Sequence, residues 1–180
     1  STSQVSAIPP LFPRLLIWNL WMKLDLGCGP NCKEGFVGVD VLRFPGVEYF
    51  VNLGKAPWPW KTGTVDEVWC SHMVEHLTAK ERIHFINELY RVLKQGSKAT
   101  IVTPYWASGR AYGDLTHQWP PVVEHWYLYL DKTWRQGYAP HNTEYRCNFH
   151  CLVQYAHNPN ATDEAHVNAI EDMAAILTKV

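Results

Sequence analysis

Two histidines and a glutamate lie within five residues near the middle of the chain, in the run His72-Met73-Val74-Glu75-His76. On a helix, the two imidazoles would lie about one turn apart on the same face, which suits a metal ion. The same H-x-x-E-H order holds catalytic zinc in one class of metalloproteases. The run therefore leaves two alternatives, a zinc-dependent protease or an unrelated fold that contains the same letters.

The surrounding elements do not place this run inside a helix. Val65–Cys70 has the length and apolar character of a strand, and it leads directly into the run. A helix pattern begins only at Thr78, which forms a capping box with Glu81. His72 and His76 are therefore expected at a strand-to-loop junction, whereas the zinc protease needs them inside a long helix. On this basis we predict that the protein needs no metal.

Short apolar runs that alternate with connections indicate a mostly parallel α/β sheet. The predicted strands are Met22–Leu26, Phe36–Asp40, Val47–Val51, Val65–Cys70 and Ala99–Thr103, and a helix is predicted over Thr78–Lys94. Beyond Tyr105 the alternation of apolar runs and connections becomes less regular. There we predict a loop over Ala107–Pro121, a short helix within Val122–Trp134, one or two strands within Tyr145–His157 and a closing helix over Ala161–Lys179.

Two connections are too short to hold a helix. Nine residues separate Leu26 from Phe36 and seven separate Asp40 from Glu48, whereas a parallel crossover normally takes a dozen or more. The first two crossover helices are therefore expected to be reduced or absent, which leaves one face of the sheet thinly covered. The apolar stretch Ile8–Trp21, the carboxyl-terminal helix or a second subunit could cover it, so a homo-oligomer stays open.

Four motifs in the chain, taken in order, resemble those of a class I S-adenosylmethionine-dependent methyltransferase. They are Leu24-Asp25-Leu26-Gly27-Cys28-Gly29, then Gly38-Val39-Asp40, then Asp66-Glu67-Val68 leading to Ser71-His72-Met73-Val74-Glu75-His76-Leu77, and finally Glu88-Leu89-Tyr90-Arg91-Val92-Leu93-Lys94. The likeness spans residues 22–104 and implies a Rossmann-like fold, methyl transfer and S-adenosylmethionine as the cofactor. This family often carries S-H-x-x-E-H-L after its fourth strand, so we interpret the likeness to a zinc protease as coincidental.

The resemblance also implies a cofactor site beyond the carboxyl ends of the strands, where open parallel sheets bind ligands. Asp40 would accept both ribose hydroxyls, and Asp25 would orient the amino group of the methionine portion. Asn52 and Leu53 would flank the adenine. The full predicted cofactor-binding set is Asp25, Gly27, Cys28, Gly29, Asp40, Val41, Asn52, Leu53, Ser71 and His72.

The sequence indicates the acceptor-binding residues less clearly than the cofactor-binding residues. Asp114-Leu115-Thr116-His117 resembles a D-P-T-H run of some family members, so His117 is the first candidate for contacting the acceptor or removing its proton. His72, expected near the sulfonium, is the second candidate, and each could instead be a structural histidine. No N-P-P-Y or D-P-P-Y follows the fourth strand, which disfavours methylation of amino groups on DNA bases. We predict a small-molecule acceptor, whose identity the sequence does not indicate.

The composition indicates which classes of partner and which cellular compartment to expect. Sixteen Lys and Arg against 17 Asp and Glu give a net charge of -1, so the overall charge attracts neither nucleic acid nor anionic lipid. The Ile8–Trp21 stretch is too short and too interrupted by prolines to span a bilayer. Five cysteines cannot all pair with one another, which favours free thiols in a reducing cytoplasm.

Two further expectations concern the organisation and activity of the whole chain. We divide it into an N-terminal extension or leader, residues 1–21, and a methyltransferase domain, residues 22–180. The alternative to catalysis is a protein that binds S-adenosylmethionine and S-adenosylhomocysteine on this scaffold without transferring the methyl group.

Overall fold

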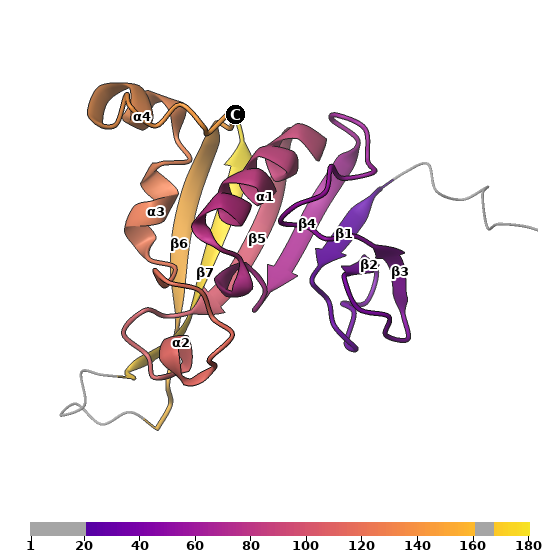
Figure 1. Ribbon diagram of the computed structural model, residues 1–180, viewed down its shortest axis with the longest axis horizontal. Helices are drawn as coiled ribbons and strands as arrows, with labels where there is room; N and C mark the ends of the chain where they lie inside the picture. The colour runs from indigo at the N-terminus through magenta and orange to yellow at the C-terminus, as the bar shows by residue number, and fades with distance from the viewer. Residues whose placement is uncertain (1–20, 161–167) are drawn as a thin grey trace, which may run out of the picture.

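The computed structural model describes residues 21–160 and 168–180, and within them seven strands form one sheet. The strands are β1 (Lys23–Leu26), β2 (Val37–Asp40), β3 (Val47–Phe50), β4 (Val65–Ser71), β5 (Leu93–Pro104), β6 (Phe149–His157) and β7 (Ile170–Lys179). Their order is β3-β2-β1-β4-β5-β7-β6, in which β1 to β5 run parallel and β7 pairs antiparallel with both β5 and β6 (Figure 1). The predicted Rossmann-like, mostly parallel α/β fold is confirmed.

The helices of the described residues are short, apart from one. They are the 3-10 helix η1 (Val74–His76) and the α-helices α1 (Ala79–Val92), α2 (Arg110–Gly113), α3 (Glu124–Leu128) and α4 (Lys132–Tyr138). α1 begins as predicted, because the Thr78 hydroxyl accepts a hydrogen bond from the Glu81 N–H and the Glu81 carboxylate accepts one from the Thr78 N–H. None of these helices is long and apolar enough to cross a membrane.

The core lies between α1 and the centre of the sheet. Phe85, Ile86 and Leu89 of α1 are fully buried, at the spacing that places them on one helix face. They belong to the same buried cluster as Leu24 of β1 and Ile101 of β5. This packing holds the carboxyl ends of the central strands in a fixed position relative to the amino-terminal end of α1.

The carboxyl-terminal segment differs from the prediction, and the predicted helix over Ala161–Lys179 is wrong. Residues 161–167 lie outside the described part of the chain, and Ile170–Lys179 is the interior strand β7, hydrogen-bonded to both β5 and β6. Met173, Ala175 and Leu177 are buried in alternation with more exposed neighbours, which is the period of a strand. Met, Ala and Leu favour helices in isolation, but pairing on both sides outweighs that local preference.

Other expectations for the carboxyl-terminal half are confirmed, except that the predicted loop over Ala107–Pro121 contains the short helix α2. The helix predicted within Val122–Trp134 corresponds to α3, with α4 beginning at the end of the same window. The window Tyr145–His157 contains one strand, β6.

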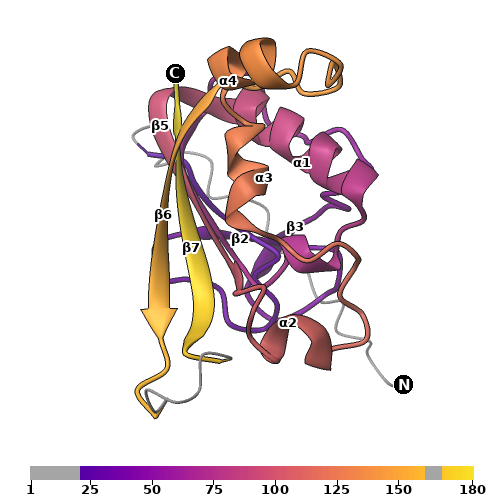
Figure 2. The same ribbon diagram turned by 90° about the vertical axis from the view of Figure 1, so that its left-hand side faces the viewer.

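The helices that the structure describes all lie on one face of the sheet (Figure 2). As the short connections predict, no helix lies between β1 and β2 or between β2 and β3. The opposite face carries Trp69 of β4, Val102 of β5 and Ile176 of β7, all partly exposed. Leu152 of β6, which is directly paired with Ile176, is 52% exposed. This face is therefore apolar and incompletely covered by the described elements.

We expect deletion of residues 1–21 to lower the melting temperature or to change the oligomeric state. Ile8, Leu11, Phe12, Leu15, Leu16 and Trp18 lie outside the described residues, and the prediction is that they cover this sheet face or that of a partner. Burial of each such side chain contributes about 1.5–3 kcal/mol. A full-length variant with serine at these six positions separates loss of apolar contact from loss of chain length. An unchanged melting temperature and solution mass in both variants would show that the segment is a dispensable extension.

Candidate functional site

A cavity of about 230 Å³ lies beyond the carboxyl ends of β1 and β2. Its wall includes Gly27, Asp40, Val41, Asn52 and Leu53, all of which belong to the cofactor-binding set predicted from the sequence. These residues come from three separate strand ends, and the parallel order of β1, β2 and β3 brings them together. The cavity lies where open parallel sheets bind ligands.

Asp40 ends β2 and joins the cavity wall to the loop that follows β1. One carboxylate oxygen accepts the Gly29 N–H at 2.9 Å, and the other accepts the Leu42 N–H at 2.8 Å. The side chain is almost buried, yet it borders the cavity. Each carboxylate oxygen has two lone pairs, so Asp40 retains capacity to accept hydroxyl donors from a ligand.

Gly27 makes the turn from β1 into the loop, and no other residue type fits there without strain. Its φ is +73°, in the left-handed region that side chains disfavour. A Cβ at this position would overlap Met73, with the Met73 Cβ only 2.6 Å away. The loop and the segment after β4 therefore approach each other closely enough to form one wall of the cavity.

The remaining predicted cofactor residues lie outside the wall of this cavity. They are Asp25, Cys28, Gly29, Ser71 and His72. Asp25 is buried, and its carboxylate accepts the Lys33 N–H at 2.7 Å, which fastens the loop after β1. Burial also raises the pKa of Asp25. Cys28 lies beside Cys32 with the two sulfur atoms 2.8 Å apart, and burial together with this neighbour raises the pKa of Cys28 to about 12.

His72 lies one residue beyond β4 with a φ of +53°. Its Nδ1 is 3.3 Å from a Glu75 carboxylate oxygen, and its Nε2 is 3.5 Å from a carboxylate oxygen of Asp172 on β7. The Glu75 carboxylate, and then that of Asp172, raise the pKa of His72 despite partial burial. Both ring nitrogens therefore face carboxylates, an arrangement that favours a role in joining β4 to β7 over proton removal from an acceptor.

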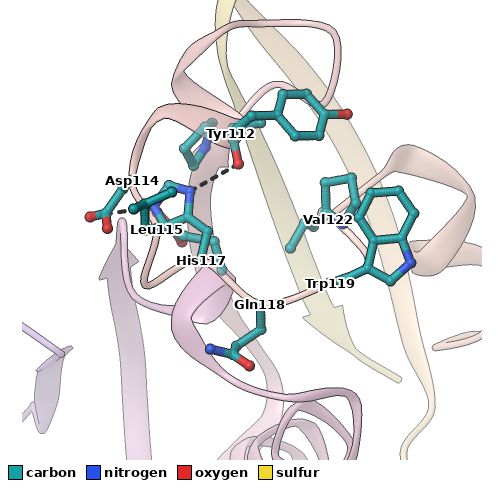
Figure 3. Close-up of a pocket in the computed structure, with 11 residues that line it drawn as sticks. Tyr112, Asp114, Leu115, His117, Gln118, Trp119 and Val122 are labelled. Carbon is teal, nitrogen blue, oxygen red and sulfur yellow. Dashed lines mark hydrogen bonds and ion pairs between the residues drawn. The ribbon is translucent and has the colours of Figure 1, made fainter.

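A second cavity, of about 190 Å³, lies beside the first and contains His117 (Figure 3). Glu75 and Val122 also line it, while Tyr112 and Trp119 are aromatic side chains of its wall that are 52% and 79% exposed. The His117 Nδ1 lies 3.0 Å from the Ala111 carbonyl oxygen, a contact that holds the ring in place. The structure thus places the sequence-predicted His117 in a cavity of its own.

A single turn separates the two cavities. Met73 and His76 line the first cavity, and Glu75, between them in sequence, lines the second. The His76 and His117 rings make an edge-to-face contact, with their centroids 4.7 Å apart. The two cavities are therefore neighbours whose walls share the turn Met73–His76.

Arg82 of α1 holds this turn in place and was missed by the sequence analysis. It is 5% exposed, and its guanidinium donates hydrogen bonds to the carbonyl oxygens of Val74, Glu75, Gln118 and Pro120. One side chain therefore ties the turn between the cavities to the segment that follows His117. The spacing of Arg82 could have indicated its burial. It precedes Phe85 by three residues and Ile86 by four, which places it on the buried face of the helix.

Replacement of Arg82 by lysine is expected to lower the free energy of unfolding by about 3 kcal/mol. Lysine presents a single ammonium group, which cannot reproduce the fork that reaches carbonyl groups on two separate segments. Urea denaturation measures the change. Lys80→Met, at an exposed position of the same helix, is the control and should change stability by less than about 0.5 kcal/mol. Equal stability of the two variants would contradict the assigned role of Arg82.

Comparison with known proteins gives a consistent result. Residues 31–101 match the methyltransferase-domain family. An S-adenosylmethionine-dependent methyltransferase from Archaeoglobus fulgidus has the same fold, with a TM-score of 0.62 and 18% identity over 89% of this chain and 87% of that chain. The 1,6-didemethyltoxoflavin-N1-methyltransferase of Burkholderia thailandensis, solved with 1,6-didemethyltoxoflavin and S-adenosylhomocysteine bound, gives 0.57 and 12% over 88% and 71%.

A third similar structure comes from a complex between the Haloferax volcanii Trm112 methyltransferase activator and a methyltransferase. It gives a TM-score of 0.54 and 13% identity over 89% of this chain and 84% of that chain. No curated protein matches the sequence.

The solved structures are distant in sequence and establish the fold, whereas the domain match bears on the family. The cavity beyond β1 and β2 fits the cofactor of that family, because Asp40 offers a carboxylate to hydroxyl groups and Gly27 keeps side-chain atoms away from the turn. The fold, the match of residues 31–101 to the methyltransferase-domain family and the cavity thus agree, and together they support a class I S-adenosylmethionine-dependent methyltransferase.

Proposed function

We propose that the chain transfers the methyl group of S-adenosylmethionine to a small-molecule acceptor bound in the His117 cavity. The observation that carries this proposal is the contact between the two cavities. His76 lines the first cavity, His117 lines the second, and their rings touch. Direct displacement requires the nucleophile and the methyl carbon to approach to about 3–3.5 Å in line. Adjacent cavities separated by one turn support such an approach.

In the first cavity, the residues act by binding and orientation. Asp40 is assigned to the ribose hydroxyls, and Asn52 with Leu53 to the adenine. Asp25, Cys28 and Gly29 shape the loop that closes this end of the sheet. S-adenosylmethionine supplies a methyl group that is already activated by the positively charged sulfur, so the protein needs mainly to align the reactants and exclude water.

In the second cavity, His117 is the first candidate for a catalytic role. A carbonyl oxygen can only accept a hydrogen bond, so the His117 Nδ1 must donate to Ala111, which leaves Nε2 unprotonated in the neutral ring. Nε2 can therefore accept a proton from an acceptor that is protonated at neutral pH. His72 is the weaker of the two candidates, because both of its nitrogens face carboxylates.

The size of the second cavity supports a small acceptor. Its volume of about 190 Å³ is smaller than the 230 Å³ of the cavity assigned to the cofactor. The Burkholderia protein of the same fold was solved with the small molecule 1,6-didemethyltoxoflavin bound, so this fold accommodates acceptors of that size. The aromatic side chains Tyr112 and Trp119 suit a flat acceptor.

Transfer from methyl-labelled S-adenosylmethionine into a cell extract, separated afterwards into small molecules and macromolecules, tests the proposal. We expect label in the small-molecule fraction. His117→Ala should reduce the transfer and leave S-adenosylhomocysteine binding intact, while His150→Ala, at an exposed position of β6, should affect neither. Label in macromolecules alone would overturn the acceptor class. Cofactor binding without any transfer would instead favour a binding protein on a methyltransferase scaffold.

A further inference from the structure

The turn between the two cavities brings together three side chains that commonly bind metal ions. Glu75, His76 and His117 each offer a donor atom, and these atoms all lie within 4.8 Å of one another. Two histidines and one carboxylate are the ligand set of several catalytic zinc sites and of the facial triad that binds ferrous iron. His117 joins the other two from a distant part of the sequence, through the fold.

Hydrogen bonds set both rings in the tautomer that metal binding requires. The His117 Nδ1 donates to the Ala111 carbonyl oxygen at 3.0 Å. The single hydroxyl proton of Thr116 is donated to the Asp114 carboxylate at 2.7 Å, so the Thr116 oxygen must accept from the His76 Nδ1, 2.9 Å away. In the neutral rings, Nε2 is therefore the unprotonated nitrogen of both histidines. Ligating histidines typically donate their other ring N–H in this way.

Glu75 provides an independent indication of a ligand. Its side chain is 4% exposed, and neither carboxylate oxygen has a hydrogen-bond partner among the described residues. The His72 Nδ1 lies 3.3 Å from one of these oxygens, and Arg82, which binds the Glu75 carbonyl oxygen, also interacts with the carboxylate charge. A buried carboxylate that lacks hydrogen bonds is costly. A cation held beside it would remove that cost.

We propose that Glu75, His76 and His117 bind a divalent transition-metal ion at the wall between the two cavities, with Zn²⁺ as its representative. This revises our expectation that the protein needs no metal. That expectation rested on placing His72 and His76 at a strand-to-loop junction, outside the long helix that the protease pattern needs. The structure directs the nitrogens of His72 towards Glu75 and Asp172 instead and supplies His117 as the second histidine.

The site suggests a class of acceptor, and this part of the inference rests on the proposed function. Glu75 and His117 line the acceptor cavity, so an ion held by three protein ligands keeps a coordination position facing that cavity. An acceptor oxygen or nitrogen could occupy this position beside the cavity that follows β1 and β2. With the ion bound, the His117 Nε2 would be a ligand and not a base, and the ion would assist loss of the acceptor proton in its place. Metal binding by the three side chains does not depend on the identity of the acceptor.

The test uses the full chain without a histidine tag, treated with a chelator, dialysed and titrated with ZnCl₂ in a calorimeter. We expect binding of one ion per chain. Glu75→Gln and His117→Asn, which preserve side-chain shape, should each weaken binding at least tenfold. His125→Ala, at an exposed histidine of α3, should leave the affinity unchanged. Visible absorption of added Co²⁺, which reports nitrogen and oxygen coordination, provides a second readout.

Absence of Zn²⁺ binding at 100 µM ion, or equal affinity in the wild type and both ligand variants, would overturn the proposal. Far-UV circular dichroism identifies a variant that has failed to fold, and the other ligand variant then decides the outcome. Failure of the metal site and failure of the proposed function remain distinguishable. Zinc binding without methyl transfer would support the metal site and contradict the proposed function. Methyl transfer by metal-free protein that also fails to bind zinc would overturn only the metal site.

Discussion

Replacement of Asp40 by alanine is expected to weaken the binding of S-adenosylhomocysteine by roughly 1.5–3 kcal/mol, about ten- to a hundredfold in Kd. Asp40 is the carboxylate at the end of β2 that borders the cofactor cavity. If Asp40 accepts both ribose hydroxyls as proposed, the substitution removes two charge-assisted hydrogen bonds. Isothermal titration calorimetry on the wild type and the variant measures the difference.

The control for Asp40→Ala must separate the carboxylate contact from a change in charge. Glu48→Ala removes the same charge from an exposed position of the adjacent strand β3, and we expect an unchanged Kd. Asp40 also accepts hydrogen bonds from Gly29 and Leu42, so Asp40→Asn, which keeps the shape of the side chain, is measured in parallel. Wild-type affinity in both Asp40 variants would place the ribose elsewhere.

The second large effect is expected for Gly27→Ala, which should destabilise the fold by about 2–5 kcal/mol. Two causes add here. Alanine at position 27 would have to adopt an unfavourable positive φ, and its Cβ would overlap Met73. Gly63 has a similar φ of +67° but open space around it. Gly63→Ala should therefore show only the conformational part, about 1–2 kcal/mol. Urea denaturation of both variants provides the comparison.

A double variant isolates the overlap with Met73. Combining Gly27→Ala with Met73→Gly removes both the Cγ and the Cβ that the new Cβ would meet. The double variant should be more stable than the sum of the two single changes predicts, because the clash is absent. If Gly27→Ala and Gly63→Ala are equally destabilising, the close approach of the turn to Met73 is not what restricts position 27 to glycine.

The first half of the fold was predictable because its signals are local. The strand ending in Asp25-Leu26 and the strand ending in Asp40 are short apolar runs, and the spacing between them excludes a helix. The capping box at Thr78 likewise depends on two residues of one turn. β7 was mistaken for a helix because its neighbours β5 and β6, which supply its hydrogen bonds, are distant in sequence or were themselves poorly defined by the pattern.

The candidate site shows the same division. Five of the eleven residues that line the cavity beyond β1 and β2 were predicted as cofactor-binding, since they follow strands in a recognisable order. The contact between His76 and His117, and the hydrogen bonds of Arg82 to the segment after His117, join parts of the chain that are far apart in sequence. No local pattern encodes such contacts, although an arginine on an apolar helix face is a usable sign of burial.

A structure of the protein bound to S-adenosylhomocysteine tests the central claim most directly. We predict that the ribose hydroxyls contact the Asp40 carboxylate and that the adenine lies against Asn52 and Leu53. The sulfur should face the turn that carries His76, towards the cavity that contains His117. A ligand bound outside the Asp40 cavity, or one whose sulfur faces away from His76 and His117, would contradict the arrangement of the two sites.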